Sequence, residues 1–127
     1  MLAYIIHGSS RVKGQNFLGE PEDFLQVGIM GLAKGTKLKP HYHLPQKKNI
    51  NKNQEVLIIL SGKMEAIFFD DQNNKKVDSA ILEGGDILVL LDGGHGFKML
   101  ADTSLVEVKQ GPYEGQHKDK NYIESFI

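Results

Sequence analysis

The sequence predicts an all-β domain, and two features of the chain support that prediction. Short apolar runs, some alternating with polar residues, are separated by Gly, Asn and Asp clusters along the whole length, while helical periodicity is nearly absent. The chain also holds 14 glycines, most of them between the apolar runs, where a small β-sandwich or barrel needs tight turns. We therefore expect antiparallel strands joined by short turns.

Turn signals separate the expected strands along the chain. Residues 61–63 reverse the chain after an apolar run, and residues 70–76, DDQNNKK, supply Asp and Asn side chains that tolerate positive φ, which indicates a hairpin. Glycines at 84–85 and at 93–94 bracket a further strand. In chain order, the strands are expected at Ala3–Ile6, Phe24–Leu32, Glu55–Leu60, Met64–Asp70, Lys76–Leu82, Ile87–Leu91, Phe97–Leu100 and Leu105–Gln110.

Length and composition predict a single domain spanning residues 1–127. A chain of this length can bury a core without disulfides, and 40% hydrophobic with 24% charged residues is a globular balance that argues against a membrane span. The segment after Gly111 is polar until Tyr122-Ile123 and Phe126-Ile127. We expect it to dock loosely or to lie against a partner subunit.

Charge and cysteine content exclude several classes of function. Fifteen Lys and Arg against sixteen Asp and Glu leave a formal net charge of −1, unlike the basic surface of a nucleic-acid binder. The chain has no cysteine, so only His, Asp and Glu remain as metal ligands. The first residues, MLAYIIHGSSRVKG, lack the charged leader and long apolar core of a signal peptide. A cytoplasmic location is expected.

His41 and His43 are the first candidates for a functional site. In a strand, residues two apart project from the same face, so both imidazoles would point into one space, as in a metal chelate. Divalent metals of intermediate softness favour imidazole and carboxylate ligands. The alternative is a solvated pair that follows the turn-forming Pro40.

The spacing around this pair resembles the first sequence motif of the cupin superfamily. Gly35, five residues, His41, one residue, His43, a longer interval, Glu55, six residues and Gly62 follow that motif in order. The interval LPQKKNINKNQ has eleven residues where the family has three or four, which indicates an inserted loop.

The second cupin motif is also present, in a weaker form. Gly84, ten residues and His95 match its spacing, but Leu90, Asp92 and Met99 stand where the family has proline, glycine and asparagine. His95 is thus the one ligand of this motif that carries over. Both motifs together span about half of the chain.

The inserted loop leaves two pairs of alternatives open. Gln46 lies three residues after His43, where the family's usual glutamate would stand, and is the rival of Glu55. Glu55 fits the six residues to Gly62 better. The lysines of the loop either attract an anion to the pocket mouth or are simply solvated.

The resemblance implies a cupin-type jelly-roll β-barrel of two antiparallel sheets with a metal inside. Its ligands would be His41, His43, Glu55 and His95, and the ion would be iron, manganese, zinc or nickel, as in cupins generally. The fold does not select the reaction. Residues 106–113, VEVKQGPY, and the run DGGHGF also resemble small cupins associated with bacterial polysaccharide or sugar-nucleotide genes.

Glu107 and Lys109 are candidate catalytic residues because they alternate with Val106 and Val108 on the last expected strand. If their face lines the cavity, they supply an acid and an amine beside the metal. On an exposed face they would be an ordinary cross-strand pair.

Three functions are compatible with this pattern. The first is a metal-dependent cupin that binds or transforms a polar small molecule, such as a sugar or sugar-nucleotide derivative; the second is a non-catalytic binding or sensing module; the third is an Fe(II)-dependent dioxygenase. The run VLIIL after Glu55 is apolar on both faces, so one face is expected to be covered by a partner in a homodimer.

Overall fold

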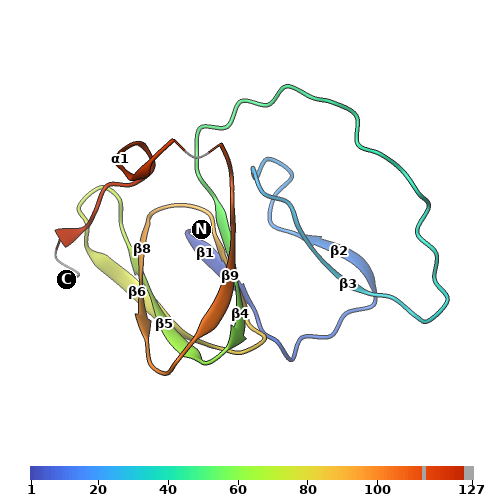
Figure 1. The fold of residues 1–127 in the computed structure, drawn as a ribbon, viewed down its shortest axis with the longest axis horizontal. Coiled ribbons are helices and arrows are strands. Elements are labelled where there is room, and N and C mark those ends of the chain that lie inside the picture. The colour runs from blue at the N-terminus through green and yellow to red at the C-terminus, as the bar shows by residue number, and fades with distance from the viewer. Residues whose placement is uncertain (113, 125–127) are drawn as a thin grey trace. The chain divides into compact units, whose positions relative to one another are not determined.

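The computed structural model describes residues 1–112 and 114–124, except for the side chains of Gln116 and His117. The chain divides into two compact units (Figure 1). A strand-rich unit comprises Met1–Ser9 and Asn53–Ile127, and a small unit comprises Ser10–Lys52. The single domain expected from the length stays a prediction, and the expected docking of Phe126 and Ile127 falls outside the described residues.

In the described ranges, all regular structure other than one four-residue helix is β-strand, which confirms the predicted all-β class. No helix in these ranges is long and apolar enough to cross a membrane. The elements are β1 (Ala3–Ile6), β2 (Gly14–Leu18), β3 (Val27–Gly31), β4 (Glu55–Ser61), β5 (Lys63–Phe69), β6 (Lys76–Glu83), β7 (Ile87–Leu90), β8 (Gly94–Met99), β9 (Ser104–Lys109) and α1 (Gln116–Asp119).

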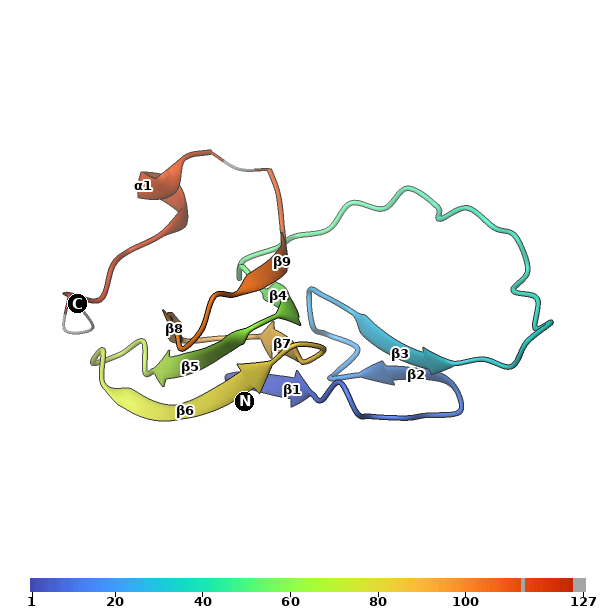
Figure 2. The same cartoon turned by 60° about the horizontal axis from the view of Figure 1, so that its bottom comes forward.

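The strand-rich unit contains two antiparallel sheets (Figure 2). One has four strands in the order β1-β7-β4-β9, and the other has three strands in the order β6-β5-β8. Among the residues that the structure describes, neither sheet closes into a barrel through strand pairing. The coarse prediction of several antiparallel sheets is confirmed, and the cupin-type jelly roll stays a prediction.

The two sheets share one hydrophobic core. Alternate residues of β4 are buried, as the period of two predicts for a strand with one inward face. Burying each large apolar side chain contributes roughly 1.5–3 kcal/mol, so this shared core is what holds the sheets together. The cluster takes Leu57, Ile59, Leu88 and Leu90 from the four-stranded sheet, and Met64, Ala66 and Leu82 from the three-stranded sheet.

Gly62, the last residue of the first cupin-like motif, has a structural role. Its φ of 98° is in the left-handed region, and a Cβ there would lie 2.6 Å from Oγ1 and 2.7 Å from Cα of Thr103. Only glycine avoids both the strained dihedral and the collision. The glycine therefore lets the β4–β5 turn approach the segment that precedes β9.

Asp86 connects the end of β1 to the β6–β7 turn. One carboxylate oxygen accepts a hydrogen bond from the backbone N–H of Gly8, and the other accepts one from the N–H of Glu83, both at 2.9 Å. Burial raises the pKa of Asp86, but the two backbone donors and nearby His7 outweigh burial, so the pKa lies below its usual value. The ionised carboxylate is therefore part of the fold.

The small unit contains one antiparallel ladder, between β2 and β3. Its register pairs Gly14 with Gly31 and Leu18 with Val27. Residues 32–52 form no regular secondary structure, and Leu44 in this stretch is 72% exposed. The segment that carries the histidine pair thus lacks both a strand ladder and a core of its own.

Three strand predictions need correction. β2 was not expected, because GQNFL has too few apolar residues to show a period. The strand expected at Phe24–Leu32 is shorter, Val27–Gly31. The strand expected from Phe97 begins at Gly94, so His95 lies within β8, where pairing with β5 outweighs the turn tendency of the flanking glycines.

Candidate functional site

Glu55 and His95 lie side by side although they belong to different sheets. Glu55 opens β4 and lies on the same face as Leu57 of the core. His95 pairs with Phe68 in the β5–β8 ladder and shares its face with Phe97, which contacts the core. The Nε2 atom of His95 is 3.5 Å from Oε2 of Glu55. Two parts of the chain that are far apart in sequence thus meet inside the strand-rich unit.

The surroundings of this pair disfavour charge on both partners. Burial raises the pKa of Glu55, and the charge of Glu107 raises it further, against the opposing effect of Lys109. Burial lowers the pKa of His95 more than the charge of Glu107 raises it. The side chain of His95 is 31% exposed, and the side chain of Glu55 is 12% exposed. Burial thus works against a fully charged ion pair at this position, and 3.5 Å is also long for a hydrogen bond.

A cavity of about 430 Å³ opens onto the pair. The His95 ring stacks on the ring of Phe97, with centroids 5.2 Å apart and planes at 30°, so one wall is aromatic. The rest of the lining mixes apolar side chains and glycines with a few polar side chains, which is the composition of a small-molecule site. The lining residues are Asn53, Glu55, Phe69, Gly93, Gly94, His95, Phe97, Asp119, Lys120, Asn121, Tyr122 and Ile123.

Glu107 and Lys109 lie on the same face of the four-stranded sheet as Glu55. Lys109 is paired with Glu55, and Glu107 is paired with Leu57, in the β4–β9 ladder. The Nζ atom of Lys109 is 3.3 Å from Oδ2 of Asp119. Burial lowers the pKa of Lys109, but the hydrogen bond and charge of Asp119 outweigh it, so the pKa lies above its usual value. In this arrangement Lys109 is a charged donor, and Glu107 is exposed.

Two glutamines that the sequence did not single out hold the start of β4. The backbone N–H of Gln54 donates to Oε1 of Gln110 at 2.9 Å, and its side-chain amide donates to the carbonyl of Leu91 at 3.4 Å. Gln54 is only 4% exposed. These bonds tie the residue before Glu55 to the ends of β7 and β9, and so direct the carboxylate of Glu55.

His41 and His43 lie in the small unit, outside any strand. The expectation that a strand aligns them is therefore wrong, because the segment has no ladder partner. Their rings are nevertheless close, with centroids 5.1 Å apart and planes at 69°, and the Nδ1 atom of His41 is 2.9 Å from the carbonyl oxygen of Lys39. Both histidines are exposed, as is the rival ligand Gln46.

The donor atoms of the Glu55–His95 pair fit two positions around a divalent metal. Ligands bonded at about 2.0–2.2 Å in tetrahedral geometry lie about 3.4 Å apart, and the observed separation is 3.5 Å. Among the described residues, no group of three or more His, Asp or Glu side chains is arranged to hold a metal. Glu55 and His95 therefore fit part of the predicted ligand set, and the other ligands stay a prediction.

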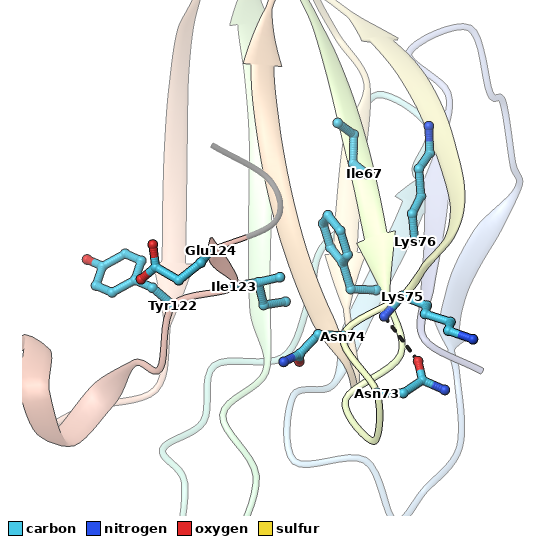
Figure 3. Close-up of a pocket in the computed structure, with 9 residues that line it drawn as sticks. Ile67, Asn73, Asn74, Lys75, Lys76, Tyr122, Ile123 and Glu124 are labelled. Atoms are coloured by element: carbon cyan, nitrogen blue, oxygen red, sulfur yellow. Dashed lines mark hydrogen bonds between the residues drawn. The ribbon is translucent and has the colours of Figure 1, made fainter.

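A second, larger cavity of about 870 Å³ lies beside β5 (Figure 3). It involves β5, the β5–β6 hairpin and the end of the described chain, and none of its described lining residues is a histidine. Its lining residues are Ile67, Phe69, Asn73, Asn74, Lys75, Lys76, Tyr122, Ile123 and Glu124. Phe69, Tyr122 and Ile123 also line the smaller cavity.

A family model described as a domain of unknown function, DUF6016, matches residues 9–81. This is more than half of the chain, and the chain belongs to that family. The matched segment includes Glu55, His41 and His43 and ends before His95. A search of curated proteins and a search of solved structures returned no significant match.

Proposed function

We propose that this chain is a small cupin-like protein that binds a divalent metal and a polar small molecule, such as a sugar or a sugar-nucleotide derivative. The observation that carries the proposal is the convergence of Glu55 and His95, one from each cupin-like motif, at 3.5 Å on a cavity of about 430 Å³. Two antiparallel sheets around one core also support a jelly-roll relationship.

In the proposed mechanism, the protein supplies one imidazole, one carboxylate and a cavity with a partly apolar lining. A bound metal would add Lewis acidity toward a carbonyl, a hydroxyl or water. Neutral His95 presents a lone pair, because burial lowers its pKa. Glu107 is the candidate proton carrier, and Lys109 is a candidate electrostatic partner for the substrate. The aromatic wall beside His95 excludes water from one side.

The metal proposal is tested by elemental analysis of protein purified without added metal. Glu55→Gln and His95→Ala should each weaken metal binding by more than the roughly 10–100-fold that a change around a ligand costs, while the β signal in circular dichroism stays. His7→Ala is the matched control, because His7 is exposed and lies beside Asp86, not beside Glu55. Full metal content in His95→Ala would contradict the proposal.

The double variant His41→Ala, His43→Ala addresses the other predicted ligands. Loss of metal in this variant would support the four-residue set of His41, His43, Glu55 and His95. Retention of one equivalent, with loss in His95→Ala, would confine the site to the strand-rich unit. The two outcomes distinguish the four-residue ligand set that the cupin resemblance implies from a site formed by Glu55 and His95 without the two other histidines.

The same preparation distinguishes the kinds of activity. A dioxygenase should consume oxygen only when loaded with ferrous iron, whereas a hydrolase or isomerase should work with zinc. A non-catalytic binding or sensing module should be stabilised by its ligand without forming product. The aromatic wall and amide groups of the cavity suit polar ligands with an apolar face, so sugars are the first compounds to screen.

The homodimer is also a proposal, supported by the outward face of the four-stranded sheet. Val106 and Val108 on β9 are 42% and 47% exposed, and they pair with Ile58 and Val56 of β4. An apolar sheet face of this kind is typical of a subunit contact. The cytoplasmic location stays a prediction.

A further inference from the structure

The last described residues form a segment that borders both cavities of the strand-rich unit. This segment, residues 119–124, is called the C-terminal strap. Asp119 through Ile123 line the cavity that contains Glu55 and His95, and Tyr122 through Glu124 line the larger cavity beside the β5–β6 hairpin. Figures 1 and 2 show the chain leaving β9, passing through α1 and returning toward the β5–β6 hairpin. The strap thus forms part of the wall between solvent and the candidate site.

The first anchor of the strap is the ion pair between Lys109 and Asp119. Its atoms are 3.3 Å apart, and the two side chains keep 28% and 19% of their surface exposed. The neighbouring pair of Lys118 and Glu114 is 3.6 Å apart, with 63% and 64% exposed, so it is an ordinary surface pair. Partial shielding makes the Lys109–Asp119 pair the stronger of the two.

The second anchor is Ile123, which sits against Gly94. A Cβ at position 94 would lie 2.7 Å from Cδ1 of Ile123 and 3.3 Å from Cβ of Phe69. Glycine at this position therefore lets Ile123 come close to the backbone of β8, one residue before His95. Phe69 is only 5% exposed although it lies on the sheet face opposite the core residues Met64 and Ala66.

Between the anchors, the strap is open to solvent. Lys120, Asn121 and Tyr122 are exposed, Tyr122 to 58%, yet all three line the cavity of Glu55 and His95. After the larger effect of burial, the charge of Lys120 acts to lower the pKa of both Glu55 and His95. A segment with two local anchors and a solvated middle can detach while both sheets stay folded.

We propose that the C-terminal strap is a gate over the Glu55–His95 cavity. It closes when Asp119 pairs with Lys109 and Ile123 seats against Gly94, and it opens to admit a small polar ligand. The inference rests on the proposed function only in taking this cavity as the ligand site. Its test needs neither metal nor substrate.

The test measures how fast His95 reacts with diethyl pyrocarbonate in chelator-treated, dialysed protein. The neutral imidazole attacks one carbonyl carbon of the reagent, an N-carbethoxy group forms, and the leaving group breaks down to ethanol and carbon dioxide. Peptide mass spectrometry follows His95, with His7 as an internal reference because its side chain is 68% exposed. An open strap should expose the His95 ring and raise its rate alone.

Lys109→Met should raise the His95 rate about threefold, the shift expected when one weak ion pair is lost. Ile123→Ala should raise the rate of His95 modification about tenfold, because an apolar anchor is removed. Lys118→Met is the matched control and should leave it unchanged. Unchanged His95 rates in both anchor variants, or an equal rise at His7, would overturn the proposal.

Gly94→Ala provides a second, independent check. The new methyl group should displace Cδ1 of Ile123 and weaken this anchor, so the His95 rate should rise, but by less than in Ile123→Ala, because Cδ1 is the flexible end of its side chain. In the double variant Gly94→Ala, Ile123→Ala the collision partner is gone, so the rate should not exceed that of Ile123→Ala. An additive increase would mean that Gly94 affects His95 without the strap, and would contradict the second anchor. If the anchor variants change the His95 rate as expected but the protein binds no metal, the metal proposal fails and the gate proposal stands.

Discussion

The two units of this chain each carry two of the four predicted metal ligands, and they hold them in different ways. In the strand-rich unit, Glu55 projects from β4, which is paired on both sides, and His95 projects from β8, which pairs with β5 and contacts the core. Their side chains meet at 3.5 Å. In the small unit, His41 and His43 lie in an exposed, irregular stretch. Strand pairing and burial determine where a side chain points, whereas a spacing in the sequence alone does not.

The largest expected difference between the units is in their contribution to stability. Leu88→Ala removes a side chain that is 0% exposed in the core of the strand-rich unit and should cost about 2–5 kcal/mol in the free energy of unfolding. Leu44→Ala, in the small unit, removes a side chain that is 72% exposed and should change it by less than about 0.5 kcal/mol. Urea denaturation measures both, and comparable losses would show that residues 32–52 have a core of their own.

The two glycines of the first cupin-like motif sharpen the comparison. Gly62→Ala combines a left-handed φ of 98° with a collision against the backbone near Thr103, and should cost about 2–4 kcal/mol. Gly35→Ala has a similar φ of 88° but nothing within 4 Å of its Cβ, so only the dihedral penalty of about 1–2 kcal/mol applies. Equal thermal stabilities of the two variants would contradict the collision at Gly62.

A smaller effect, and a dependence on pH, is expected at Asp86. Asp86→Asn should cost about 1–2 kcal/mol at pH 7, because two backbone N–H groups lose an ionised acceptor. Since the folded pKa of Asp86 lies below its ordinary value of 3.8, this contribution is complete above the unfolded pKa. It is lost as the pH falls through 3.8 and then through the folded pKa.

The control for Asp86 is Asp23→Asn in the small unit. Asp23 accepts one exposed backbone hydrogen bond, from Glu20 at 2.9 Å, so its replacement should cost about 0.5 kcal/mol or less. The measurement is urea unfolding from pH 7 to pH 3, with the gap between wild type and Asp86→Asn narrowing in acid. A gap that stays constant with pH would rule out the ionised carboxylate as the cause.

Much of the strand pattern could be predicted because it depends on local periodicity. Ala3–Ile6 was predicted with the bounds that β1 has, and the runs at β4, β5, β6, β7 and β9 were predicted to within a residue or two at each end. β2 was missed because its ladder with β3 compensates for its few apolar residues. The start of β8 was missed because glycines dominate its sequence, and only pairing with β5 makes them a strand.

The candidate site was predictable in part. The spacing of the cupin-like motifs identified Glu55 and His95, which the structure brings together. Asp119 and Lys120 were missed, since a polar tail has no period that reveals which of its side chains faces a cavity. Gln54 was missed because an amide next to a motif residue looks like any loop residue until its hydrogen bonds are known.

By itself, the sequence determined the all-β class, most of the strands and the two residues that meet between the sheets. These depend on the alternation of apolar side chains and on glycines that permit turns, and both are local properties of the chain. Only the tertiary structure decided which sheet each strand joins, that Lys109 pairs with Asp119, and that Ile123 rests on Gly94. Those contacts join residues whose proximity depends on how the whole chain folds, because no local pattern encodes the distance between side chains on different strands.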